Sequence, residues 1–182
     1  MFGFATIVFF SVTGITLNHP DWFGLATDRS QDFSGRIPEK LLTTSDPATT
    51  EGVDRLGLAE FLRHEHRIKG SVTDFRSDDL ECTIIWKGPG YSADAIIDRE
   101  TSSYEISIVE HGVIPLINDL HKGRDTGPAW SLVIDLSAAL MTISAITGVV
   151  LLLYIRRKLV SGMVTGVVGL VAMLAAIFWL VP

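Results

Sequence analysis

The chain has 182 residues, of which 47% are hydrophobic, and a formal net charge of −6. Its mean hydropathy is +0.35, and the apolar residues gather at the two ends, which is typical of a membrane protein with one modest soluble domain. Residues 19–128 contain 20 acidic and 12 basic residues, so this segment carries a charge of −8. Such a charge argues against nucleic acid or anionic lipid head groups as its partners.

The first apolar segment, residues 1–18, predicts a transmembrane helix. Its uncharged part is only about 16 residues long, which is close to the lower limit for crossing a bilayer as a helix. No basic region precedes it, and no small-x-small cleavage site lies before His19. We therefore favour a retained signal anchor over a cleaved signal peptide, with a natural start upstream of Met1 as the alternative.

The middle of the chain predicts an external α+β domain. Residues 19–50 are rich in Asp, Ser, Thr and Pro without a sustained period, which predicts an irregular segment with one short strand. Apolar residues recur at helical spacing over 51–67 and predict an amphipathic helix. Four β-prone runs separated by turns then predict an antiparallel meander of three or four strands, at 71–76, 80–86, 91–98 and 103–109. A short helix over 113–120 leads back to the membrane.

Two further transmembrane helices are predicted at 130–155 and 159–181. Asp135 and Tyr154 are the only ionisable residues between 131 and 155, and 159–181 has none, so both segments can cross a bilayer. The basic run 156–158 places the turn between them in the cytoplasm, by the positive-inside rule. The predicted fold is thus a three-helix membrane protein with a cytoplasmic N-terminus and an extracytoplasmic α+β domain over 19–128.

Two histidines are predicted to lie at the same face of the bilayer. His19 follows the first apolar segment, and His121 stands in Leu120-His121-Lys122-Gly123-Arg124, just before the second. One interpretation gives them no cofactor: His121 caps the short helix, and residues 123–128 form an elbow at the membrane surface.

Other candidate sites are weaker. His64 and His66 diverge by about 200° on a helix of 3.6 residues per turn, so they cannot face one metal ion. Cys82, the sole cysteine, is interpreted as a packed thiol that forms no disulfide. The sequence has no nucleotide loop, Ser-His-Asp order, zinc spacing or paired catalytic carboxylates, so we expect no self-contained catalytic site.

The order of several motifs resembles the PepSY-associated transmembrane proteins. The first span ends with Thr-Gly, followed by Leu17-Asn18-His19. The middle domain has a helix before its strands and contains Lys87-Gly88-Pro89-Gly90 and Ile97-Asp98-Arg99. The run from Leu120 to Arg124 then precedes a span that contains Thr147-Gly148. The resemblance covers most of the chain except residues 20–50. It implies a multi-pass protein of the bacterial inner membrane, with a PepSY-like external domain over 51–128.

The resemblance implies two classes of function. Members of the family include ferric-siderophore reductases with b-type haem, which implies a component of membrane redox or iron handling. Its haem would have His19 and His121 as iron ligands and Arg124 to neutralise a propionate. The haem-bearing relatives usually have another histidine at the cytoplasmic head of the first helix, where this chain begins Met1-Phe2-Gly3. The PepSY module is also associated with secreted peptidases, which implies the alternative of a non-enzymatic, membrane-anchored module that binds a partner protein or peptidase.

Overall fold

The computed structural model describes residues 1–20, 22, 28–42, 52–155 and 159–180. The chain forms two compact units. One comprises Phe4–Ile134 and holds the sheet with the helices around it; the other comprises Met1–Gly3 and Asp135–Pro182 and consists mainly of long apolar helix. Each unit is described by itself below.

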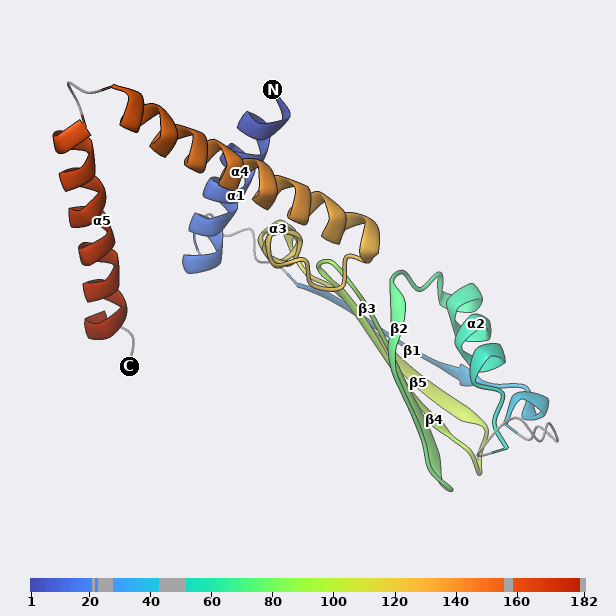
Figure 1. The fold of residues 1–182 in the computed structure, drawn as a ribbon. Helices are drawn as coiled ribbons and strands as arrows, with labels where there is room; N and C mark the ends of the chain where they lie inside the picture. The colour runs from blue at the N-terminus through green and yellow to red at the C-terminus, as the bar shows by residue number, and fades with distance from the viewer. Residues whose placement is uncertain (21, 23–27, 43–51, 156–158, 181–182) are drawn as a thin grey trace. The chain divides into compact units, whose positions relative to one another are not determined.

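The first unit is built on a five-stranded antiparallel sheet in the order β1-β5-β4-β3-β2 (Figure 1). Consecutive strands from β2 to β5 are neighbours, which confirms the predicted meander. The strands are β1 (Arg29–Arg36), β2 (Ser71–Ser77), β3 (Glu81–Gly88), β4 (Tyr91–Asp98) and β5 (Ser103–Glu110).

Strand β1 changes the predicted organisation of residues 19–50. The expected short strand is eight residues long and pairs with β5 along its whole length, from Arg29 opposite Glu110 to Arg36 opposite Ser103. A domain limit at residue 51 therefore leaves out an edge strand of the sheet. Backbone pairing holds this strand, because its side chains are almost all exposed and Phe33 is its one large apolar residue.

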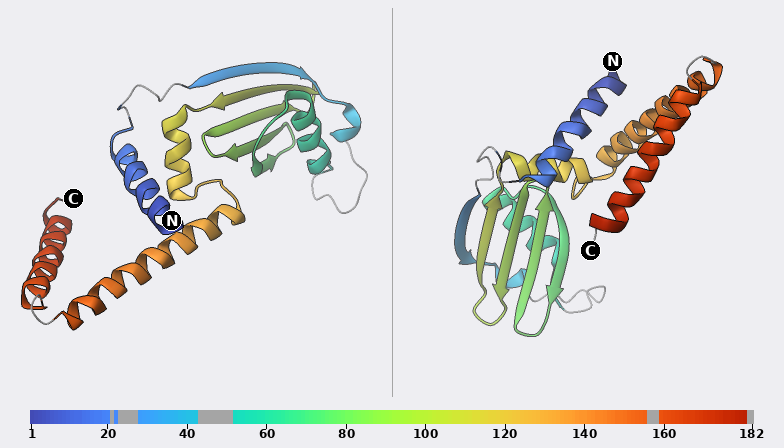
Figure 2. Two further views of the ribbon diagram at one scale, coloured as in Figure 1. Left: turned by 90° about the horizontal axis from the view of Figure 1, so that it is seen from above. Right: turned by 90° about the vertical axis from the view of Figure 1, so that its left-hand side faces the viewer.

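Helix α2 (Arg55–His66) lies against one face of the sheet (Figure 2). It begins where the Asp54 carboxylate accepts a hydrogen bond of 2.8 Å from the amide of Gly57, which satisfies a free donor of the first turn. It ends at Arg67, whose left-handed backbone (φ 53°) closes the last turn through a bond to the Arg63 carbonyl. The predicted amphipathic helix is thus present between two defined caps.

The hydrophobic core lies between α2 and the sheet. Alternate residues of β3 and β4 are buried, so one face of these strands is covered and the other is open. The fully covered side chains come from both layers and include Leu58, Leu62, Ile84, Trp86, Ala93 and Ile97. Cys82 belongs to this core: it is 0% exposed, and its sulfur lies 3.2 Å from the Ser77 hydroxyl. The predicted packed thiol is confirmed.

Four further helices complete the described chain: α1 (Phe2–Asn18), α3 (Val113–Lys122), α4 (Pro128–Tyr154) and α5 (Leu159–Leu180). A single-turn helix, η2 (Glu39–Leu41), follows β1. Among the described residues, α4 and α5 are long and apolar enough to cross a membrane. Three such helices were expected; α1 has 17 residues, a length of about 25 Å against a hydrocarbon core of about 30 Å. The structure therefore shows two helices of spanning length and one shorter apolar helix.

Candidate functional site

Helix α3 joins the sheet to α1 through opposite faces. On one face, the Asp119 carboxylate accepts a hydrogen bond of 3.0 Å from the amide of Gly90, in the β3–β4 turn. Towards α1, the Thr16 hydroxyl donates a hydrogen bond of 2.9 Å to the side-chain oxygen of Asn118, and His121, on the face opposite Asp119, contacts α1. Residues two apart on a helix point about 200° away from each other, so α3 is held on both sides.

His121 packs directly on α1. Its Nδ1 lies 2.5 Å from the Thr13 hydroxyl oxygen, and its ring meets Phe10 edge-on at 5.1 Å between centroids. Gly14 faces the same ring, and a Cβ on that residue would make an ordinary van der Waals contact of 3.8 Å with the imidazole Cε1. The Thr13 hydroxyl donates to the Phe9 carbonyl at 2.7 Å, so its oxygen is left to accept, and we expect the tautomer of His121 that carries its proton on Nδ1.

His19 has a separate set of contacts, beyond the end of α1. Its ring stacks on Trp22, with 3.8 Å between the centroids and 9° between the planes. Its Nε2 accepts a hydrogen bond of 3.3 Å from the Asn18 amide. His121 contacts α1 at Thr13, six residues before His19, which corresponds to about 9 Å along a helix. The structure thus brings α3 to α1, and the two predicted iron ligands have different partners.

Arg124 lies just after the C-cap of α3. Its amide donates a hydrogen bond of 2.9 Å to the Asp119 carbonyl, and its side chain is exposed. Gly123 adopts a left-handed backbone (φ 69°) at the cap, and the Trp130 indole donates a hydrogen bond of 2.8 Å to the Leu120 carbonyl. Residues 123–128 therefore form a defined turn between α3 and α4, at the position of the predicted elbow. The expected cap was wrong, because Gly123 and not His121 caps α3.

Two of the three remaining histidines of the sheet unit have protein partners. His66 Nε2 lies 2.8 Å from the Tyr104 hydroxyl, and His111 Nδ1 lies 3.0 Å from the Asp28 carboxylate. His64 is exposed. No group of three or more His, Cys, Asp or Glu residues that could hold a metal ion occurs in the described part of the chain.

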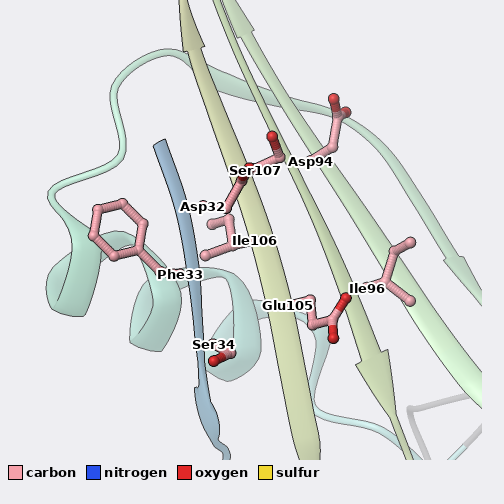
Figure 3. Close-up of a pocket in the computed structure, with 8 residues that line it drawn as sticks. All are labelled: Asp32, Phe33, Ser34, Asp94, Ile96, Glu105, Ile106 and Ser107. Carbon is pink, nitrogen blue, oxygen red and sulfur yellow. The ribbon is translucent and has the colours of Figure 1, made fainter. Parts of the chain in front are cut away.

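The face of the sheet opposite α2 is hollowed over β1, β5 and β4. Asp94, Ile96 and Glu105 point away from α2, whereas Phe33 points towards it (Figure 3). The strand register sets the open side chains in rows across the sheet. One row is Asp32, Ser107 and Asp94; the next is Ser34, Glu105 and Ile96.

A second hollow continues this surface towards β3. It shares Ile96 and Glu105 with the first and adds Glu81 and Asp98. We call the two hollows together the open face. Its ionisable side chains are five carboxylates and one phenol, with no Lys, Arg or His lining either hollow. Ile96 is 52% exposed at its centre, so an apolar side chain stands within a ring of acids.

Basic side chains of the sheet unit lie on both sides of the sheet. Arg36 and Arg76 face the open side from the two edge strands, and a basic cluster lies at the α2 side of β1 and β5. A small hollow there is lined by Arg29, Arg67 and Lys69 together with Glu110. Lys69 and Glu110 form a salt bridge of 2.8 Å. This contact raises the pKa of the lysine and lowers the pKa of the carboxyl. The hollows on the two sides of the sheet therefore differ in the charge of their lining.

Sequence reasoning did not find the open face. Its acids come from four strands that are distant in sequence, so no local motif joins them. Alternation within β4 (Asp94, Ile96, Asp98) was a usable signal, since such residues share one side of a strand. What was missing was β1, which brings Asp32 beside Ser107.

The described helices and sheet define a class: a membrane protein with an α+β domain attached to apolar helices. The chain belongs to the PepSY_TM-like family, whose model matches residues 2–182. This confirms the resemblance drawn from the sequence motifs and extends it to residues 20–50. The searches of curated proteins and of solved structures gave no match.

Proposed function

We propose that this protein is a membrane-anchored interaction module that binds a partner protein through the open face of its sheet. The supporting observation is that α2 covers one face of the sheet, while the opposite face carries two adjoining hollows with Ile96 exposed between them. Aliphatic side chains exposed at the centre of a polar rim are typical of protein contact surfaces.

Position-specific cross-linking in native membranes tests this proposal. A photoreactive amino acid at Ile96 should yield a discrete cross-linked species, while the same group at Leu56 should not. Leu56 is the matched control because it is 73% exposed on α2, away from the open face. Equal labelling patterns at the two positions, or no discrete product from Ile96, would rule out the open face as the binding surface.

We propose further that the protein crosses the bacterial inner membrane three times, with α1 as the first span and residues 19–128 extracytoplasmic. The length and composition of α4 and α5 support two of these spans. For α1, the support is its exposed apolar surface, which includes Phe4, Ile7 and Ile15, opposite the Thr13 and Thr16 side that packs on α3. A helix somewhat shorter than the hydrocarbon core is accommodated by local thinning of the bilayer.

Haem binding in redox or iron handling is the second candidate. One observation favours it: Nδ1 of His121 lies 2.5 Å from the Thr13 hydroxyl oxygen, and an imidazole whose Nδ1 donates to a protein oxygen presents Nε2 to a metal. The described contacts do not form a bis-histidine site, because a haem needs both rings on opposite sides of its plane. His121 packs on α1, and His19 stacks on Trp22. We therefore rank this function below partner binding.

A visible spectrum of the purified protein, with and without dithionite, tests the haem proposal. A reduced α-band that is lost in both His19→Ala and His121→Ala would support it and would require these side chains to leave their present partners. A colourless, monodisperse protein after expression with added haem precursor would exclude it. Arg124→Ala tests the propionate role in the same experiment.

A further inference from the structure

We propose that the open face binds a cationic segment of a partner protein, one that carries Lys or Arg side chains around an aliphatic residue. This inference rests on the proposed partner binding and specifies its chemistry. The charge of the surface is its main support: five carboxylates and no basic side chain line the two hollows. Arg36 and Arg76, which face the same side of the sheet, stand on its two edge strands.

The carboxylates are free to form ion pairs with a partner. Among the described residues, no salt bridge involves Asp32, Asp94, Glu81 or Glu105, whereas Asp74, at the sheet edge, is paired with Arg76 at 2.9 Å. Asp98 differs from the others, because its carboxylate accepts bonds from the amides of Glu100 and Thr101. Four uncompensated acids around one aliphatic side chain favour a partner of opposite charge.

The spacing of these acids favours an extended surface contact over a bound metal ion. Asp32 and Asp94 flank Ser107 in one row, two strands apart, which corresponds to about 10 Å at 4.8 Å per strand. Glu105 lies in the next row, about 7 Å further along the strand direction. A divalent cation needs ligand oxygens within about 2.5 Å of one point, and no described group of side chains provides this.

Ile96 explains why the proposed partner segment should contain an aliphatic residue. It stands in the row of Ser34 and Glu105 and is shared by both hollows. An aliphatic partner side chain placed on Ile96 would lie within reach of the surrounding acids, so cations on either side of it could pair with Asp94 and Glu105. Charge then orients the partner, and burial of Ile96 holds it.

The test uses the full chain in nanodiscs of zwitterionic lipid and a labelled peptide with Lys at alternate positions around one Ile. We expect saturable binding, weakened about threefold to tenfold at low salt by the double substitution Asp94→Asn with Glu105→Gln. The matched control, Glu60→Gln with Glu65→Gln, removes two exposed acids of α2 and should change the Kd less than twofold. A peptide with Glu in place of Lys should not bind.

Two further arms complete the test. Ile96→Ser should weaken binding of the peptide even when Asp94 and Glu105 are both present. Calcium chloride should compete with the peptide no better than sodium chloride of equal ionic strength. If neutralising Asp94 and Glu105 leaves the Kd unchanged in a protein of normal melting temperature, the cationic partner is excluded. Cross-linking from Ile96 would still occur if only the charge inference is wrong, whereas its absence would remove the proposed function itself.

Discussion

Single residues show how closely the sheet unit is packed. Gly35 of β1 illustrates this, because a Cβ there would lie 2.6 Å from the Tyr104 hydroxyl. That hydroxyl is also 2.8 Å from His66 Nε2, and Phe33 lies beside the same imidazole at 5.0 Å between ring centroids. The edge strand thus meets the C-terminal end of α2 through an aromatic cluster that tolerates no added methyl group.

Two leucines on α2 provide a direct test of the packing. Leu62 is 0% exposed, and Leu56 is 73% exposed on the same helix. We expect Leu62→Ala to lower the free energy of unfolding by about 2–5 kcal/mol, because it removes buried apolar contacts and leaves a cavity. Leu56→Ala should change it by less than about 0.5 kcal/mol. Denaturant unfolding followed by tryptophan fluorescence measures both; equal effects would contradict the placement of α2.

The stability of the protein at low pH should depend on the carboxylate of Asp98, at the end of β4. Backbone amides of Thr101 and Glu100 lower the pKa of Asp98 below its ordinary 3.8. A carboxyl with a lower pKa in the folded chain stabilises the fold above its unfolded pKa, and this contribution is lost as the pH falls through the folded value.

We therefore expect Asp98→Asn to flatten the decline in melting temperature below about pH 4, since an amide oxygen still accepts both bonds but does not titrate. Melting curves between pH 3 and pH 7 test this. At pH 7 the variant should remain folded, with the turn intact. An unchanged slope on the acid side would show that Asp98 does not contribute to it.

At the scale of elements, α3 is the piece whose contacts explain the His121 position. Thr13→Val should remove the acceptor of the His121 Nδ1 proton without changing the side-chain shape. A partly buried donor left without a partner costs about 1–3 kcal/mol, so we expect a lower melting temperature in detergent.

Thr147→Val is the matched control, because Thr147 only donates to its own helix, 2.8 Å from the Ile143 carbonyl. A double-mutant cycle of Thr13→Val with His121→Phe should give a coupling energy of about 1 kcal/mol. Additive effects of the two substitutions would mean that the 2.5 Å contact contributes nothing to stability.

The elements that the sequence predicted well are those with a strong period. Alternation marks β3 and β4, helical spacing marks α2, and long uncharged runs mark α4 and α5. Strand β1 was assigned poorly because its sequence, Arg-Ser-Gln-Asp-Phe-Ser-Gly-Arg, is polar on both sides. An edge strand can be held by backbone hydrogen bonds to one neighbour, and such bonds leave no pattern in the side chains. The open face was missed for the same reason, since Asp32 reaches it only through this pairing.

At the scale of the whole molecule, the topology predicts which engineered thiols are reachable from outside. A cysteine at His64, which is exposed on α2, should react with a membrane-impermeant maleimide in intact spheroplasts. A cysteine at Arg157, in the basic run between α4 and α5, should react only after the membrane is permeabilised. The reverse pattern would invert the proposed orientation.

Cys82 should not react with the maleimide in that experiment, because it is buried. Its burial has a wider consequence. A thiol with no accessible surface reacts only when the sheet opens, so its rate of alkylation under native conditions measures the free energy of that opening. Alkylation of the native Cys82 thus reports the stability of the sheet without an engineered label. A partner bound on the open face should slow the modification of Cys82, because ligands that bind only the closed sheet reduce the open population.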